Sequence, residues 1–169
     1  HFLRIDLGDF LQMRVRPIPL PLPASSSVGH WAEGRDMATV SVIVTSYNIQ
    51  DYLPQCLDSV CGQTLEDLEI IVVDDASSDS SPDIIREYAA RDPRIVPILR
   101  TQRSPGGVAT PANAGLDAAT GTWVGFADGD DVCEPTMFQQ LVAAAERHDS
   151  DLAMGDYRLF HDHIEEDTL

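Results

Sequence analysis

The sequence contains no lysine, and all 11 of its strong bases are arginines. This absence excludes a Walker A nucleotide loop, because that loop needs a lysine on the phosphates. It also argues against a receiver domain of the response-regulator type, which combines acidic residues after a strand with a lysine. Sugar-nucleotide pyrophosphorylases are disfavoured as well, because their glycine-rich loop with arginine and lysine is missing.

Positive charge is scarce, and the formal net charge of the 169 residues is −17 at pH 7. Residues 1–36 hold four acids and four arginines, so the whole excess of negative charge lies in residues 37–169. A surface this acidic repels phosphate backbones, which argues against nucleic acid as a partner. Any phosphate compound that binds is expected to bring a cation with it.

Cysteine pairs and long apolar runs are also missing. The three cysteines form no C-x-x-C pair, which indicates free thiols in a reducing compartment. No run of about 18 apolar residues exists, so no membrane-spanning helix is expected. Prolines at every second position of residues 17–23 break any signal peptide. We therefore expect a cytoplasmic protein, whose acceptor or parts outside this chain would still allow association with a membrane.

The first 36 residues differ in composition from the rest. Residues 17–27, PIPLPLPASSS, are typical of a polyproline-type linker. Residues 1–13 could be the tail of another element. Residues 1–36 are therefore interpreted either as a linker from a preceding domain or as an extension upstream of Met37, and residues 37–169 as one domain.

From Thr39 onward, short β-branched apolar runs alternate with segments of helical periodicity. This alternation predicts an α/β domain with a mostly parallel sheet and helices on both faces. The predicted strands are residues 39–46, 68–75, 94–100, 122–128 and 150–160, and the predicted helices are residues 51–62, 80–92, 109–120 and 135–146.

Polar side chains follow three of the predicted strands, at the point where each strand ends. The first strand leads into residues 45–48, the second ends in Asp74 and Asp75, and the fourth leads into residues 128–131. In open parallel sheets, ligands bind outside the carboxyl ends of the strands. The convergence of these groups predicts a ligand site at this edge of the sheet.

The acidic loop DGDD, residues 128–131, is the centre of the predicted site. Gly129 would let the backbone turn tightly, so that Asp128 and Asp130 point at one place. Two like charges about 4 Å apart repel by roughly 1 kcal/mol in water and by several-fold more in a partly buried cleft. A divalent cation removes that penalty, and this ligand set favours Mg²⁺ or Mn²⁺. A solvated turn or a helix N-cap is the alternative interpretation.

The other polar residues at this edge are each ambiguous on their own. Asp74 and Asp75 either cap the turn that follows them or accept hydrogen bonds from the N–H groups of a nucleobase. Tyr47 either stacks on that base or is half-buried packing. Thr45 and Asn48 are open to both interpretations in the same way.

Three segments together resemble the family 2 glycosyltransferases of the GT-A fold: VSVIVTSYN, LDSVCGQTLEDLEIIVVDDASSD and NAGLDAATGTWVGFADGDD. The resemblance covers residues 40–157 in motif order, spacing and strand context. It implies a Rossmann-like nucleotide-binding half that transfers a sugar from a nucleotide-diphosphate donor with inversion at the anomeric carbon. The acceptor would be a polysaccharide, a wall polymer, a lipid-linked molecule or a small molecule.

The resemblance also implies a role for each residue of the base pocket. Thr45 and Tyr47 would line the pocket, with Asn48 beside them. Asp75 would accept a hydrogen bond from the base, which favours a uracil nucleotide, and Asp74 would lie next to it.

The acidic loop would complete the donor site. Asp128 would contact the ribose and diphosphate and would share Mg²⁺ or Mn²⁺ with Asp130, the principal metal ligand, while Asp131 supports both. Asn113 would lie near the nucleotide. Many relatives carry an arginine immediately before this asparagine, whereas this chain has Ala112. A positive partner for the donor is therefore expected to be missing.

No general base is assigned. In the family this base is an acid well C-terminal to the acidic loop, and Glu165, Glu166 and Asp167 come too early for it. We therefore expect the donor-binding half without the acceptor half. The alternatives are a nucleotide-binding module without activity, or a doubly wound domain that uses its acids for a metal alone. His161 and His163 could share a strand face as metal ligands, but their place near the end of the chain disfavours that role.

Overall fold

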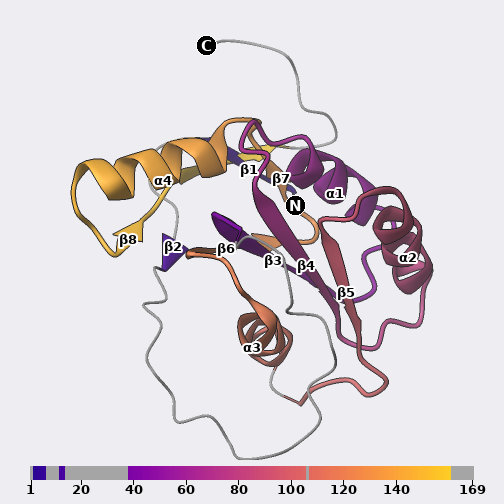
Figure 1. Ribbon diagram of the computed structural model, residues 1–169. Coiled ribbons are helices and arrows are strands. Elements are labelled where there is room, and N and C mark those ends of the chain that lie inside the picture. Colours follow the sequence, from indigo (N-terminus) through magenta and orange to yellow (C-terminus); the bar gives the residue numbers. More distant parts are fainter. Residues whose placement is uncertain (1, 7–11, 14–37, 106, 161–169) are drawn as a thin grey trace, which may run out of the picture.

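Four parallel strands form the centre of the fold in this computed structural model (Figure 1). β3 (Val40–Ser46) lies between β4 (Leu68–Asp74) and β6 (Trp123–Asp128), and β5 (Ile95–Leu99) pairs with β4 on the outside. The predicted parallel sheet is confirmed. The structure describes residues 2–6, 12–13, 38–105 and 107–160.

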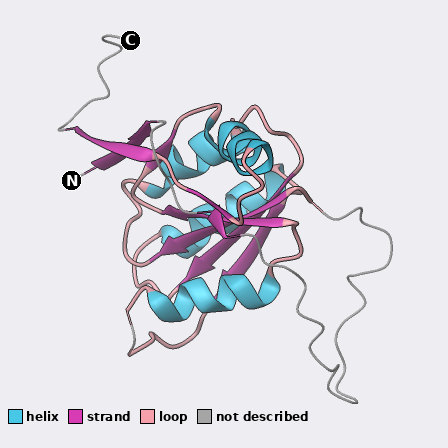
Figure 2. Cartoon of the chain, turned by 90° about the vertical axis from the view of Figure 1, so that its left-hand side faces the viewer, coloured by secondary structure: helices cyan, strands magenta, loops and turns pink. Residues whose placement is uncertain are grey.

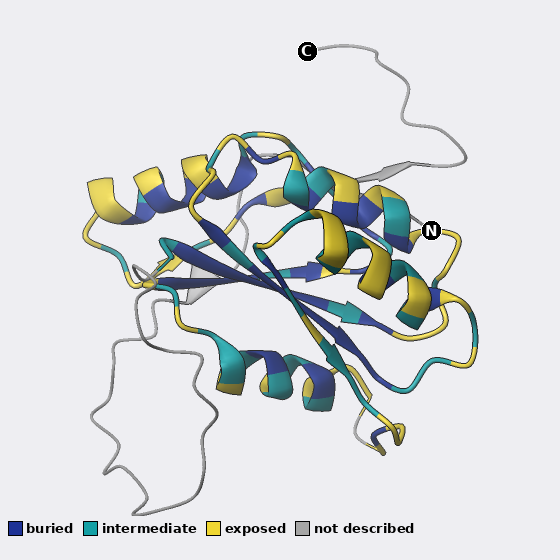
Figure 3. Cartoon of the chain, turned by 45° about the vertical axis from the view of Figure 1, so that its right-hand side comes forward, coloured by how far each residue is buried: buried dark blue, intermediate teal, exposed yellow. Residues whose placement is uncertain are grey.

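The helices cover both faces of this sheet, as predicted (Figures 1 and 2). α1 (Leu53–Cys61), α2 (Ser81–Arg91) and α4 (Met137–Arg147) pack on one face, and α3 (Ala109–Ala118) packs on the other. Each helix turns its buried stripe towards the sheet and its exposed side towards solvent (Figure 3). Helices on both faces leave no room for a solvated strand face, which explains the continuous apolar runs of the strands.

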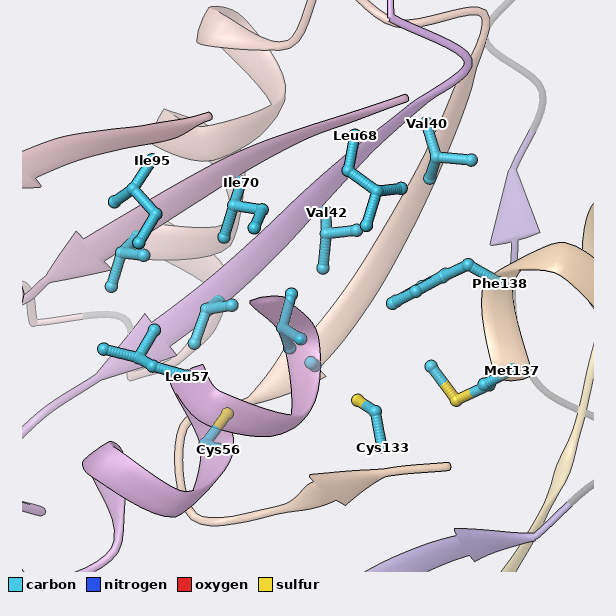
Figure 4. Close-up of a cluster of buried hydrophobic side chains, with 14 of the residues drawn as sticks. Val40, Val42, Cys56, Leu57, Leu68, Ile70, Ile95, Cys133, Met137 and Phe138 are labelled. Carbon is cyan, nitrogen blue, oxygen red and sulfur yellow. The ribbon is translucent and has the colours of Figure 1, made fainter. Parts of the chain in front are cut away.

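Alternate residues of β3 serve the two layers. Val42 and Val44 lie in the apolar cluster with Leu57 of α1 and Phe138 of α4 (Figure 4). Ile43 points to the opposite face, where it meets Gly115 of α3. A Cβ atom at residue 115 would lie 2.5 Å from Cγ2 of Ile43. The glycine is therefore what allows α3 to pack this close to the sheet.

The cysteines belong to this core and are free thiols, as predicted. Cys56 and Cys133 are buried in the same apolar cluster, while Cys61 is half-buried (Figure 4). Burial raises the pKa of Cys133 to about 12 and that of Cys61 to about 11. These thiols therefore stay protonated and unreactive at neutral pH. Among the described helices, none has the length and apolarity needed to cross a membrane.

The predicted fifth strand, residues 150–160, is two strands in two different sheets. β8 (Leu152–Ala153) extends the large sheet, and β9 (Asp156–Phe160) belongs to a three-stranded sheet. The chain passes from one sheet to the other at Gly155, a buried residue that lies between β8 and β9 in the sequence. The prediction of a single strand was wrong because the two halves find different backbone partners, which local hydrophobicity does not encode.

Two segments of the first 36 residues pair with the domain. β1 (Phe2–Asp6) lies between β9 and β7 (Val132–Cys133), and β2 (Gln12–Met13) lies between β6 and β8. The division of the chain at residue 36 stays a prediction. β2, with two residues, is too short to show a periodicity in the sequence. The proline-rich residues 17–27 lie outside the described residues, and so do the histidines and acids considered within residues 161–169.

Candidate functional site

A cavity of about 350 Å³ lies at the carboxyl edge of the parallel sheet, where the sequence predicted a ligand site. The ends of β3 and β6, the loops after β4 and β5, and the start of α3 form its walls. The residues that line it are Thr45, Ser46, Tyr47, Ile49, Asp75, Arg103, Gly107, Val108, Pro111, Asp128, Gly129 and Asp130.

Asp128 and Asp130 stand side by side in this cavity. Asp128 is the last residue of β6, and its carboxylate accepts a hydrogen bond from Oγ1 of Thr45 on the neighbouring strand, at 3.3 Å. Partial removal of water by the cavity walls, together with the negative charge of Asp130, raises the pKa of Asp128. The structure therefore holds two carboxylates that repel one another, and a cation between them would relieve that repulsion.

Gly129 is needed between these acids because of close packing. Its N–H donates to the carbonyl oxygen of Thr45 at 3.0 Å. A Cβ atom here would lie 2.6 Å from that oxygen and 2.5 Å from Cδ1 of Ile49. The tight turn expected here is present, since residues 129–130 form a turn. It does not need a left-handed glycine, because the glycine with a positive φ among the described residues is Gly107, at 60°. What requires a glycine at position 129 is the close contact of the loop with the end of β3.

Asp131 does not line the cavity. It is buried, with 6% of its surface exposed, and its backbone N–H donates to the carbonyl oxygen of Asp128 at 2.9 Å. This bond closes the turn that carries Asp130. Asp131 is thus the buried acid of the loop, whereas Asp128 and Asp130 line the cavity.

The acidic loop fits a cation that takes few ligands from protein. Across the described residues, no three His, Cys, Asp or Glu side chains gather closely enough to hold a metal ion. Asp128 and Asp130 alone would supply the protein ligands. Mg²⁺ and Mn²⁺ accept such sites, because water and substrate phosphates fill their remaining positions.

Tyr47 and Arg103 form another wall of the cavity. The guanidinium carbon of Arg103 lies 4.1 Å from the centre of the Tyr47 ring, which is the geometry of a cation–π contact. Tyr47 keeps 37% of its surface exposed. Tyr47 thus lines the site with a partly exposed ring, one face of which is covered by Arg103, a residue that the sequence analysis did not single out.

Asp75 is buried, with 4% of its surface exposed, and its carboxylate is already engaged. Ser104 donates to it twice, from its backbone N–H at 3.1 Å and from its hydroxyl at 2.7 Å. Arg100 forms an ion pair with it, with Nε 3.2 Å from Oδ1. Asp75 thus ties the loop after β5 to the end of β4. A nucleobase could use Asp75 only by sharing an oxygen with these donors.

Asp74 and Asn48 point away from the cavity into neighbouring turns. The carboxylate of Asp74 accepts hydrogen bonds from the backbone N–H and the hydroxyl of Ser77, at 2.8 and 2.5 Å. Asn48 accepts one from the backbone N–H of Ser78 at 2.8 Å. For Asp74, the capping interpretation is the one these contacts show. Asn48 and Ala76 both have positive φ, 52° and 61°, so strained residues adjoin the site.

Asn113 and Ala112 lie on α3 but not on the cavity wall. Arg103 and Gly107, from the loop after β5, line the cavity instead, and the place of Asn113 near the nucleotide stays a prediction. A signal for this loop was present, because it is rich in glycine and proline and follows a predicted strand at the same edge of the sheet.

Comparison with known proteins agrees with this geometry. The sequence model of a family described as "Glycosyl transferase family 2" matches residues 41–169. The chain belongs to this family.

Individual relatives support the same assignment. Over 113 residues, 67% of this chain, the family 2 domain is 43% identical to "Uncharacterized glycosyltransferase EpsJ" of Bacillus subtilis (strain 168), of which it covers 32%. Over 118 residues, 69% of this chain, it is 36% identical to a poly(ribitol-phosphate) beta-glucosyltransferase of Bacillus spizizenii, of which it covers 18%. The chain thus spans less than two fifths of the length of these and the other most similar curated relatives.

A solved structure confirms the fold. S. aureus TarS in complex with UDP-GlcNAc superposes with a TM-score of 0.61 and 30% sequence identity, over 66% of this chain and 32% of that one. The predicted GT-A-type α/β fold is therefore confirmed, and the match covers part of the larger enzyme.

Proposed function

We propose that this chain forms the donor-binding part of a glycosyltransferase that takes its sugar from a nucleotide diphosphate, with UDP-sugars favoured. One observation carries the proposal: Asp128, Asp130 and Tyr47 open into a single cavity at the carboxyl edge of the sheet. This arrangement offers carboxylates for a metal–diphosphate group and an aromatic face for a base. The likeness to TarS, which binds UDP-GlcNAc, supports a uracil nucleotide.

Asp128 and Asp130 would hold Mg²⁺ or Mn²⁺, and the bound ion would stabilise the negative charge that develops on the diphosphate leaving group. The protein keeps the two acids in place before the ligand arrives. Thr45 fixes the carboxylate of Asp128 through its hydroxyl, and Gly129 anchors the loop to the end of β3.

The base would lie towards Tyr47 and Thr45. The ring of Tyr47 offers a face for stacking, and Asp75 would accept a hydrogen bond from the base at an oxygen that it shares with Ser104. Asp74 and Asn48 would contribute by fixing the turns around this pocket. Asp131 would support the metal loop from behind.

Transfer would proceed with inversion, because an acceptor hydroxyl would attack the anomeric carbon from the side opposite the departing diphosphate. None of the described residues is assigned as the base for that hydroxyl. The acceptor, which could be a polysaccharide, a wall polymer, a lipid-linked molecule or a small molecule, would bind with parts of the protein beyond the donor site.

The donor site is tested by thermal unfolding with UDP, with and without Mn²⁺. At about 100 times its Kd a ligand adds about 2.7 kcal/mol to the free energy of unfolding, roughly 5–10 °C in Tm for a chain of this size. We expect this shift with UDP and Mn²⁺ together and its loss in Asp130→Ala.

Asp117→Ala is the matched control, because Asp117 is an exposed acid on α3 that does not line the cavity. This variant should keep the whole shift. Wild-type protein that shows no shift with UDP and Mn²⁺, or Asp130→Ala that keeps it, would contradict the proposal.

A nucleotide-binding module without activity is the second candidate, and the uncharged Ala112 is the observation in its favour. Both candidates predict UDP binding. They differ in whether the full-length protein releases UDP from a UDP-sugar in the presence of acceptor or water. Release that is lost in Asp130→Ala supports the enzyme, whereas binding without release supports the module.

A further inference from the structure

We propose that Arg103 binds the diphosphate of the donor and is the protein's own cation at this site. The inference rests on the proposed function, since it assumes a nucleotide diphosphate in the cavity. It assigns a binding role to the loop after β5. Three observations support it: the unequal charges of the cavity, the position of the guanidinium over the Tyr47 ring, and the anchoring of the loop.

The charges that line the cavity are unequal. Three carboxylates line it, whereas Arg103 is the one cationic side chain among its described lining residues. Asp75 is already paired with Arg100 at 3.2 Å. A divalent cation would offset Asp128 and Asp130, and the two negative charges of a sugar diphosphate would then face Arg103. The start of α3 adds no charged side chain, because residues 109–112 are Ala, Thr, Pro and Ala.

The stacked position of Arg103 leaves its donors available. A guanidinium is planar and carries its five N–H groups around the edge of the plane. Arg103 lies over the Tyr47 ring with its guanidinium carbon 4.1 Å from the ring centre, and this contact with the π face involves no hydrogen-bond acceptor. None of the hydrogen bonds and ion pairs found among the described residues occupies that edge. The edge can therefore bind phosphate oxygens in the bidentate manner typical of arginine.

The loop that carries Arg103 is fixed on both sides of it. Arg100 forms an ion pair with the buried carboxylate of Asp75, and Ser104 donates hydrogen bonds to it. The backbone N–H of Arg100 also donates to the carbonyl oxygen of Asp74 at 3.0 Å. Asp75 is thus a positioning residue for Arg103, in addition to any contact with the base. A side chain held this way loses less conformational entropy when the ligand binds.

The test compares UDP with uridine, which lacks the phosphates. The Kd of UDP with Mn²⁺ is measured by calorimetry, and that of uridine by NMR titration. In Arg103→Ala we expect UDP to bind at least tenfold more weakly and uridine to change less than twofold. Arg103→Lys keeps the charge but loses the planar fork, so its loss for UDP should be intermediate, about three- to fivefold.

Arg91→Ala is the matched control, because Arg91 also lies over a tyrosine, Tyr88, at 5.8 Å, but does so on α2 and outside the cavity. Its UDP affinity should stay within twofold of wild type. The urea midpoint of every variant is measured, so that a folding defect is not taken for lost binding.

The outcomes distinguish a failure of the proposed function from a failure of the role of Arg103. If wild-type protein binds no UDP with Mn²⁺, the proposed function fails. If wild type binds UDP and Arg103→Ala binds it equally well, the role of Arg103 is overturned and the donor site stands. If Arg103→Ala weakens uridine as much as UDP, Arg103 acts on the base, and its assignment to the diphosphate is overturned.

Discussion

The two edges of the parallel sheet both carry acidic side chains, but these side chains differ in how many hydrogen bonds they accept. At the amino edge, Glu69 accepts hydrogen bonds from the hydroxyl of Ser41 at 2.5 Å and from the backbone N–H and hydroxyl of Thr120 at 2.9 and 3.0 Å. Ser41 in turn accepts one from the N–H of Gly121 at 2.8 Å. This cluster satisfies its own polar groups and closes the end of α3 onto the sheet.

At the carboxyl edge, the carboxylate of Asp128 accepts one hydrogen bond among the described residues, a long one from Thr45, and Asp130 also lines the cavity. The raised pKa of Asp128 reflects its loss of water and this neighbouring charge. A cluster whose polar groups all find hydrogen-bond partners stabilises the fold. Two like charges held close together lower its stability, and a ligand that neutralises them removes this repulsion. The polar groups at the amino edge therefore stabilise the fold, whereas those at the carboxyl edge are the ones we propose for binding.

The largest effect is expected from the two tightly packed glycines, one at each edge. A Cβ atom at residue 129 would lie 2.6 Å from the carbonyl oxygen of Thr45, and one at residue 121 would lie 2.6 Å from the backbone nitrogen of Ser41. Because backbone atoms of β3 cannot move aside, Gly129→Ala and Gly121→Ala should each lower the free energy of unfolding by about 3 kcal/mol. Urea unfolding measures both.

The two glycine variants should differ in binding although they match in stability. At a temperature where both are folded, Gly121→Ala should keep its affinity for UDP and Mn²⁺ within twofold. Gly129→Ala should lose at least tenfold, because its substitution displaces the loop between the two acids. Equal affinity in the two variants would show that the acidic loop does not form the ligand site.

The next effect concerns the amino edge alone. Glu69→Ala leaves the hydroxyls of Ser41 and Thr120 without their acceptor and removes one of the two acceptors of the Thr120 N–H, so the free energy of unfolding should fall by about 2 kcal/mol. The affinity for UDP should not change, since Glu69 lies at the opposite end of β4 from the cavity. A variant as stable as wild type would mean that water replaces the carboxylate without cost.

The smallest effect is a gain in stability from Asp128→Asn. A carboxyl group whose pKa is raised on folding costs free energy above its ordinary pKa of 3.8, and costs nothing below it, where it is protonated in both states. The variant should therefore be more stable than wild type at pH 7 but not at pH 3. The gain should stay below about 1 kcal/mol, because water still reaches this side chain.

Thermal unfolding at both pH values measures the gain of Asp128→Asn, and UDP titration with Mn²⁺ should show weakened binding in the same variant. A variant that is stabilised yet binds poorly would confirm that the carboxyl edge is strained in favour of its ligand. A loss of stability at pH 7 would show that the hydrogen bond from Thr45 outweighs the repulsion by Asp130.

The strands and helices of residues 39–147 could be predicted because each is buried on a repeating set of positions. β3 has a continuous apolar run since both of its faces are covered, and α1 repeats apolar residues at Leu53, Leu57 and Val60. The shortest strands could not be predicted in this way. β7 of the small sheet and β8 of the large sheet are each two residues long and exist because a distant segment supplies their hydrogen bonds.

The position of the site was predictable for a different reason. The chain direction of a parallel sheet brings the ends of β3, β4 and β6 to one edge, so the order of the polar residues already placed Thr45, Asp75 and Asp128 together. The separate structural roles of neighbouring residues were not predictable. Asp74 and Asp75 are adjacent in sequence, yet one caps a turn and the other holds the loop of Arg103.

The sequence by itself determined the α/β fold, the family and the edge at which a ligand would bind, because periodicity and strand order are properties of the chain. Only the tertiary structure decided which groups share the cavity. Gly129 is required because a Cβ atom there would collide with the carbonyl oxygen of Thr45, and Arg103 lies over the ring of Tyr47. Each of these contacts joins residues that are distant in sequence. Contacts of this kind depend on how packed elements meet, and a linear pattern does not record that.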